Sequence, residues 1–218
     1  MTSEDGQPTP EGEEHHGILD RLEEGLLVTG RYSVARRHTA EAVFEGVLPL
    51  LGIILAGYIS AHMQELFVVF EATLLAAVGT SIAHFVSGFG GAYLTERAEG
   101  HHLIEELKKN SKSLKLSPAL IVSMERETTM VISFIKGAVP AVTVLITSLP
   151  MFLALFGVID YLGSFLASIC VGLALLFILG IFLGKIAETS IWMSAVKTVF
   201  AGLLTLALLF VVSFLTGA

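Results

Sequence analysis

The chain has 218 residues, of which 54% are hydrophobic and 15% are charged, and its formal net charge is −7. Soluble domains are about 45–50% apolar and about 25% charged, so this composition argues against an ordinary soluble enzyme. The acidic balance argues against a nucleic-acid partner, which would require a basic surface. A single cysteine, Cys170, excludes both an intrachain disulfide framework and a Cys-rich metal cluster.

The first 41 residues divide into two polar segments. Residues 1–17 (MTSEDGQPTPEGEEHHG) are acidic and lack the apolar stretch of a signal peptide. We expect them to be disordered, because they bury too little apolar surface to offset the loss of chain entropy. Apolar residues at helical spacing in 18–41 predict a cytoplasmic amphipathic helix, which would lie on the membrane surface or on the protein's own cytoplasmic part.

Five long runs without a charged side chain follow. They hold 19 residues after Glu45, 24 after Glu71, 23 after Lys136, 24 after Asp160 and 21 after Lys197. A helix needs about 20 apolar residues to cross a bilayer, and the strands of a β-barrel would be shorter and alternating. The sequence therefore predicts an all-α polytopic membrane protein with five transmembrane helices.

The charge pattern also orders these segments along the chain. Residues 42–94 hold transmembrane helices one (about 42–60) and two (about 66–94). Residues 95–130 form a short cytoplasmic helical hairpin, in which Pro118 takes the first helical position of the second arm. Residues 131–218 hold helices three (about 131–155, broken by Pro140 and Pro150), four (about 161–184) and five (about 194–216).

The basic residues set the predicted orientation. With five spans, all 13 Lys and Arg residues fall on one side, whereas the other side carries only Glu65, Glu71 and Asp160. The positive-inside rule then predicts an integral multi-pass protein with its N-terminus in the cytoplasm and its C-terminus outside or in a lumen. The compact chain without eukaryotic sorting signals favours a prokaryotic plasma membrane.

Ionisable and helix-distorting residues occur inside the predicted spans, where lipid makes them costly. Glu45, with Pro49, Gly52 and Ala56, lies on a small or acidic face of helix one, and a carboxylate there suits a cation or proton pathway. The alternative is that Glu45 is solvated at the headgroups. His84 could relay protons or bind a metal, or it could be bonded to a neighbouring helix. Lys136 could pair with Glu45 or extend to the headgroups.

A second group of metal-ligand residue types lies in the cytoplasmic segment. Glu96, Glu99, His102 and Glu106 fall on one face of a helix, and Met124 and Glu127 could close the site from the next helix. Carboxylates and imidazoles bind divalent transition metals. The alternative is ordinary surface charge on a solvated helix.

Four segments resemble the vacuolar iron transporter family, which includes yeast and plant vacuolar iron and manganese carriers. FEGVLPLLGIILAG resembles the first helix of the family, SGFGGAYLTERAE the end of its second helix, LSPALIVSMERE its second cytoplasmic helix, and AVKTVFAGLLTLALLFVVSFLTG its fifth span. The order of these elements fits over residues 40–218.

The resemblance implies a homodimer that exports Fe²⁺ or Mn²⁺ from the cytoplasm in exchange for protons. Helix one would line the path at the dimer interface, with Glu45 in place of the family's Asp. Glu96, Glu99, Glu106 and Glu127 would correspond to its cytoplasmic glutamates. Two positions depart from the family: Gly88 stands where the family has a Met, and Ala92 where it has a Glu. His84, one turn before Gly88, could supply a replacement ligand.

The sequence thus predicts a proton-coupled carrier of Fe²⁺ or Mn²⁺, with no permanently bound cofactor. Its path would include Glu45, Pro49, His84, Gly88 and Lys136. Two alternatives stay open: a membrane metal-binding sensor or scaffold of the same fold, and a transporter of another substrate. We expect no enzymatic activity, because the sequence has no nucleophile–base pair, HExxH motif or phosphate-binding loop.

Overall fold

The computed structural model describes the backbone of residues 32–114 and 118–216, and the side chains of residues 38–98, 126 and 129–216. Five α-helices make up almost all of it, and the described residues contain no strand. The helices are α2 (Tyr32–Ser60), α3 (Leu66–Leu114), α4 (Pro118–Leu155), α5 (Tyr161–Ile186) and α6 (Ile191–Thr216). Residues 1–31, with the predicted disordered segment and the start of the predicted amphipathic helix, lie outside the described residues.

All five helices contain a stretch long and apolar enough to cross a bilayer. These stretches are His38–Ser60, Leu66–Ala98, Thr129–Leu155, Tyr161–Ile186 and Ile191–Thr216. This confirms the prediction of an all-helical chain with five such spans, and it is consistent with an integral membrane protein.

Several helix ends differ from the predicted ones. α2 begins at Tyr32, so the end of the predicted amphipathic helix is part of the first long helix. α3 is one helix of 49 residues that continues out of the predicted second span, as expected for the helical first arm of residues 95–130, and ends at Leu114. α4 begins at Pro118, as predicted, but it is not broken: it continues through Pro140 and Pro150 to Leu155. Proline is tolerated in such helices when neighbouring helices and hydroxyl side chains compensate for the missing N–H.

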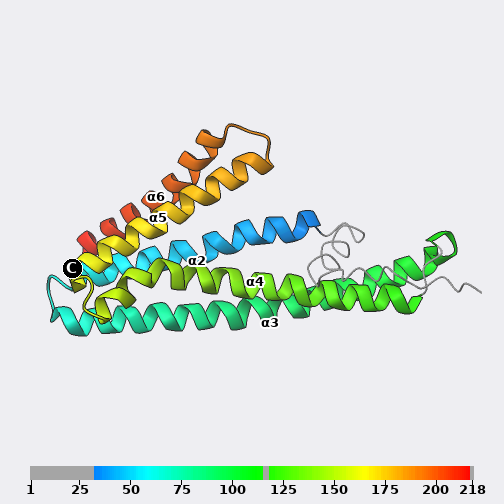
Figure 1. Cartoon of the computed structure of the whole chain (residues 1–218), viewed down its shortest axis with the longest axis horizontal. Coiled ribbons are helices and arrows are strands. Elements are labelled where there is room, and N and C mark those ends of the chain that lie inside the picture. The colour runs from blue at the N-terminus through cyan, green and yellow to red at the C-terminus, as the bar shows by residue number, and fades with distance from the viewer. Residues whose placement is uncertain (1–31, 115–117, 217–218) are drawn as a thin grey trace, which may run out of the picture.

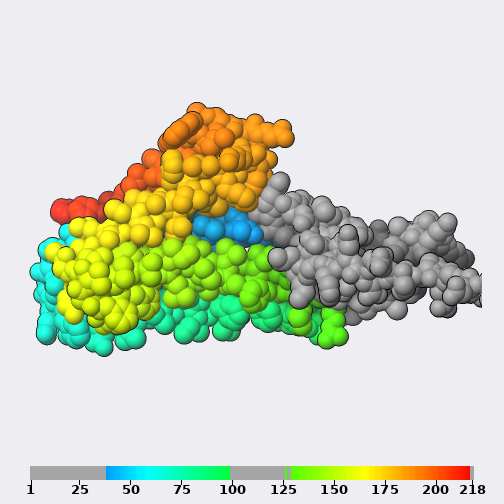
Figure 2. Space-filling model, viewed as in Figure 1, coloured from blue at the N-terminus to red at the C-terminus, as the bar shows by residue number. Residues whose placement is uncertain are grey.

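α2 is the central helix of the bundle. It contacts each of the other four helices and lies between the α3–α4 pair and the α5–α6 hairpin (Figure 1). Its inward side chains Leu50 and Ile54 pack with Phe70, Val144 and Phe165 in the main apolar core. On the face shown in Figure 2, α4 and α5 leave only a narrow strip of α2 visible.

The α3–α4 pair is antiparallel and packs by close backbone contact (Figure 1). A Cβ at Gly88 would lie 2.5 Å from the carbonyl oxygen of Lys136, and one at Gly137 would lie 2.7 Å from that of Phe85. The carbonyl of Lys136 lacks its usual helical donor, because Pro140 has no N–H. Small residues that let backbones approach in this way are typical of helix pairs in membranes.

The α5–α6 hairpin uses the same kind of contact. Positions Gly180 and Gly184 of α5 meet the backbone of α6 at Ala195 and Ile191. Asp160 begins α5: its side chain accepts a hydrogen bond from the backbone N–H of Gly163 at 2.7 Å. Among the described helices, α6 contacts only α5 and α2.

We predict that Gly88→Ala destabilises the protein by about 1–3 kcal/mol, because the new methyl group forces α3 and α4 apart. Gly90 lies one half-turn away, where a Cβ meets nothing within 4 Å. Gly90→Ala is therefore the matched control, and it should stabilise the helix by up to about 1 kcal/mol. Thermal or detergent-induced unfolding of the two variants measures the difference. Equal stabilities would show that the close contact is not part of the packing.

Candidate functional site: an exposed acidic stripe on α2

One face of α2 is left open in the single chain. We call the residues Glu41, Glu45, Pro49, Gly52 and Ala56 the α2 stripe. Glu41, Glu45, Pro49 and Ala56 are exposed, and a Cβ at Gly52 would meet nothing within 4 Å. The next residue of α2, Gly46, packs on α4, where a Cβ would lie 2.7 Å from the carbonyl oxygen of Pro140. The stripe therefore faces away from α4, and no helix of the described chain covers it.

Glu45 presents two kinds of oxygen on this stripe. Among the described residues, its carboxylate forms no hydrogen bond or ion pair, although it lies within the apolar span of α2. Pro49 comes four residues later and has no N–H, so the backbone carbonyl of Glu45 also loses its regular helical donor. A carboxylate and an adjacent freed carbonyl are both acceptors for a cation.

The N-terminal end of the stripe is tied to a histidine. Nδ1 of His38 and Oε2 of Glu41 are 3.2 Å apart, three residues apart on α2. The side chain of Glu41 is 49% exposed, whereas that of His38 is 12% exposed. Lys136 is half-buried on α4, and no ion pair between it and Glu45 is present in the described part of the chain.

The C-terminal end of the stripe opens into a groove between α2 and α6. Its lining combines small or polar residues of α2 with apolar and hydroxyl residues of α6, and its volume is about 190 Å³. The lining residues are Ala56, Ile59, Ser60, Leu209, Val212, Ser213 and Thr216. The groove leaves space beside the stripe that this chain does not fill.

His84 lies on α3 at the edge of the α3–α4 contact. It is half-buried, between Ser81 and Gly88, which both meet α4. Oγ of Ser81 donates a hydrogen bond of 3.0 Å to the carbonyl of Ala141. The imidazole forms no hydrogen bond with another described residue, so the predicted alternative of a ring bonded to a neighbouring helix is not seen in this part of the chain.

The structure gives Gly88 and Ala92 a packing role. Gly88 lies against the backbone of α4, and Ala92 is 7% exposed. A Met side chain at position 88 would collide with the backbone of Lys136 and Gly137, because even a Cβ is too close there. A thioether ligand and this helix contact are therefore incompatible. Whether the position also borders a transport path stays a prediction.

Only one of the six predicted cytoplasmic metal ligands has a described side chain. Glu96 is buried, with 8% exposed, and it takes part in a polar interaction within the chain. The side chains of Glu99, His102, Glu106, Met124 and Glu127 lie outside the described residues. Among the side chains that are described, no three His, Cys, Asp or Glu residues come together as a metal site.

The backbone register of α3 and α4 indicates which positions of the two predicted arms lie level with each other. Ser81 meets Ala141, Phe85 meets Gly137 and Gly88 meets Lys136, so residues facing each other on α3 and α4 have numbers that add up to about 222–224. Continuing that register places Glu96 level with Glu127, and Glu99 level with Met124. Sequence periodicity alone could not give this alignment, because it depends on the Gly88–Gly137 contact.

The fold thus defines an all-helical chain with five potential spans and an uncovered acidic stripe on its central helix. The chain is similar to the uncharacterized protein MJ0645 of the archaeon Methanocaldococcus jannaschii, with 28% identity over 177 residues. The similarity covers 79% of this chain and 85% of that protein. No family model and no solved structure matches the chain.

We predict that Ser81→Ala destabilises the protein by about 0.6–1.7 kcal/mol, because it removes an interhelical hydrogen bond beside His84. The matched control is Ser168→Ala on α5, since Ser168 is fully buried and its Oγ has no partner in the described chain. Ser168→Ala should be neutral or stabilising, because it removes an unsatisfied hydroxyl. The unfolding midpoints of the two variants test this, and a larger loss for Ser168→Ala would contradict it.

Proposed function

We propose that this protein is a proton-coupled carrier that exports a divalent transition metal, Fe²⁺ or Mn²⁺, from the cytoplasm. The observation that carries the proposal is Glu45, an exposed carboxylate without a partner in the described chain, within an apolar span. Leaving an ionised group against lipid is costly, so an intramembrane acid of this kind is typical of an ion path. The resemblance to the vacuolar iron transporter family supports the same substrate class.

The proposed active form is a homodimer in which the α2 stripes of two copies face each other. Gly52 and Ala56 permit close approach of a second helix. Pairing the stripes would remove Glu45 from lipid and would create a path that neither chain forms alone. The predicted orientation, with the basic ends of the spans in the cytoplasm, places Glu45 near the cytoplasmic entrance of that path.

The proposed cycle uses protonation to release the metal. Deprotonated Glu45 binds the cation with its carboxylate, while the freed carbonyl beside Pro49 replaces part of the hydration shell. A proton from the outer compartment then neutralises the carboxylate, and the cation leaves. His84 would carry protons along α3. The cytoplasmic continuation of α3 and α4, with Glu96, Glu99, His102, Glu106, Met124 and Glu127, would form the helical hairpin that concentrates the metal.

A metal-binding sensor or scaffold is the second candidate function. It is favoured by Gly88 and Ala92, because neither can supply the ligand that the family has at these positions. The similarity to an archaeal protein supports a prokaryotic plasma membrane for either function. Flux measurements separate the two, since a sensor binds metal but does not carry it.

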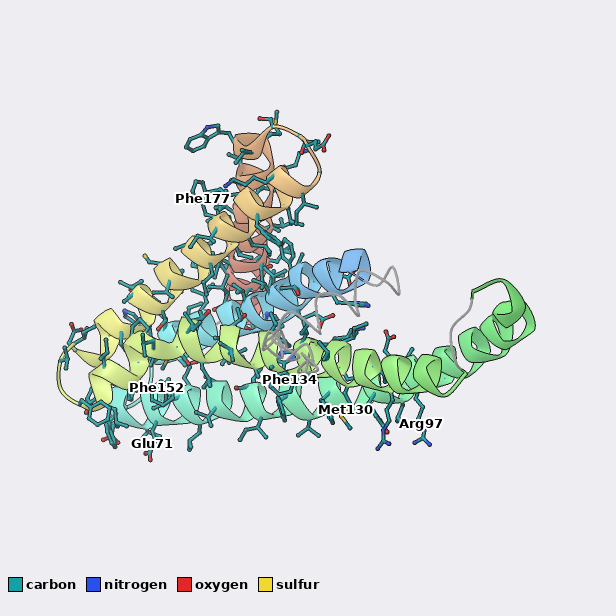
Figure 3. The ribbon with its side chains drawn as sticks, turned by 45° about the vertical axis from the view of Figure 1, so that its right-hand side comes forward. Glu71, Arg97, Met130, Phe134, Phe152 and Phe177 are labelled. Atoms are coloured by element: carbon teal, nitrogen blue, oxygen red, sulfur yellow. The ribbon has the colours of Figure 1, made fainter. Side chains whose placement is uncertain are left out.

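For the carrier, we predict that Glu45→Gln lowers Fe²⁺ or Mn²⁺ flux into proteoliposomes by roughly tenfold or more. Losing a metal ligand should reduce activity at least as much as losing a residue that hydrogen-bonds to a ligand. Flux should also depend on an opposing pH gradient. Glu71→Gln is the matched control: Glu71 is exposed near the start of α3, at the end away from Arg97 (Figure 3), and its loss should leave flux unchanged. Unaltered flux in Glu45→Gln would overturn the proposal.

For the dimer, we predict that a cysteine at Ala56 forms an intermolecular disulfide under mild oxidation, because paired stripes bring the two copies of this residue together. Cys170 is exposed and is first changed to Ala. The control is Ala83→Cys, an exposed alanine on α3. Non-reducing electrophoresis of membranes measures the fraction of cross-linked dimer. Equal cross-linking at both positions would argue against a dimer through the α2 stripe.

A further inference from the structure

Three aromatic side chains form a ladder along one side of α3. Phe85 and Phe89 stack with ring centroids 6.1 Å apart and planes 9° apart, and Phe89 and Tyr93 stack at 6.3 Å and 12°. Phe134 of α4 meets Phe85 edge-on at 6.2 Å. Phe85 is 39% exposed and Phe134 is 54% exposed, so the ladder borders an open surface of the α3–α4 pair.

The ladder ends at two arginines. Arg97 follows Tyr93 by one helical turn, and Arg126 precedes Met130 and Phe134 at the same spacing on α4. The α3–α4 register places Arg97 level with Arg126, since their numbers add up to 223. Both arginines are exposed, and no ion pair of either is seen among the described side chains. Figure 3 shows Arg97 and Met130 near each other on the same edge of the pair.

Helix length places this arginine pair at the membrane surface. Glu71 and Arg97 are exposed charged residues toward opposite ends of the α3 span, and 26 residues separate them, or about 39 Å of helix. The hydrocarbon core is about 30 Å thick, and the bilayer with its headgroups is about 40–45 Å thick. A bilayer centred between the two residues puts Arg97 and Arg126 at the depth of the phosphates. The ladder then lies along the acyl chains below them.

We propose that Arg97, Arg126 and the aromatic ladder form a binding site for an anionic phospholipid of the leaflet at this end of the bundle. The guanidinium groups suit a phosphate, to which arginine can donate paired hydrogen bonds. The rings offer rigid apolar surface to an acyl chain, and Tyr93 lies where amphipathic rings are favoured. A soluble anion would use only the arginines, whereas the ladder requires an occupant with a hydrocarbon chain. The site does not depend on the transport proposal.

Native mass spectrometry of the purified full chain tests the site with two probes, phosphatidylglycerol and phosphatidylcholine with identical acyl chains. The wild-type protein should bind phosphatidylglycerol more tightly. Arg97→Gln with Arg126→Gln should lower that affinity by roughly 30-fold, about fivefold for each basic residue near the surface, and should lower phosphatidylcholine binding less, because the choline cation neutralises the charge of that phosphate. Equal binding of the two lipids by the wild-type protein would overturn the proposal.

Two control variants distinguish a specific lipid site from a non-specific effect of positive charge. Lys185→Gln with Lys197→Gln removes the same charge from the α5–α6 hairpin and should keep the preference for phosphatidylglycerol; an equal loss would refute a specific site. Arg97→Lys with Arg126→Lys retains the charges and should keep part of the preference, even if the glutamine pair does not fold. Glycerol 3-phosphate should not displace the lipid, because it lacks acyl chains; displacement at equal concentration would also refute the site.

Discussion

The close contact between α3 and α4 at Gly88 and Gly137 sets the arrangement of everything that lies along these two helices. In a bilayer, apolar side chains gain little by leaving lipid for protein, so a helix pair depends on intimate packing. Two glycines allow the backbones to meet, and the carbonyl of Lys136, deprived of its donor by Pro140, lies at the point of contact. The register fixed there aligns Ser81 with Ala141 in the membrane. Farther along the pair, the same register aligns Arg97 with Arg126 and Glu96 with Glu127.

The spans could be predicted because charged side chains are costly in hydrocarbon, so the spans are visible in the sequence as long uncharged runs. The uncharged runs after Glu45, Glu71, Lys136, Asp160 and Lys197 each correspond to a long helix. Helix ends were harder to predict, since a helix can leave the membrane without any change in its hydrogen bonding. α2 accordingly begins at Tyr32, ahead of the predicted first span, and α3 ends at Leu114. Pro140 suggested a break that the neighbouring helices prevent.

The candidate site likewise has features that the sequence could predict and features that it could not. The shared face of Glu45, Pro49 and Gly52 follows from helical spacing, and the structure leaves that face uncovered. The packing role of Gly88 could not be predicted from helical spacing. A glycine in a helix indicates close approach of another backbone, but it does not show which helix approaches. The pairing of Arg97 with Arg126 also required the register. Long-range alignment between helices is the information that a single sequence does not carry.

The position of α6 affects how the protein can fit bilayers of different thickness. Its 26 residues span about 39 Å, which exceeds a hydrocarbon layer of about 30 Å, and leaning is one way in which such a helix fits the layer. Figure 1 shows the α5–α6 hairpin inclined to the α3–α4 pair. α6 touches only α5 and α2 among the described helices, whereas α5 also packs against α3 and α4, so α6 is the helix that can change its lean in a thinner or thicker bilayer with the least disturbance of the α3–α4 pair.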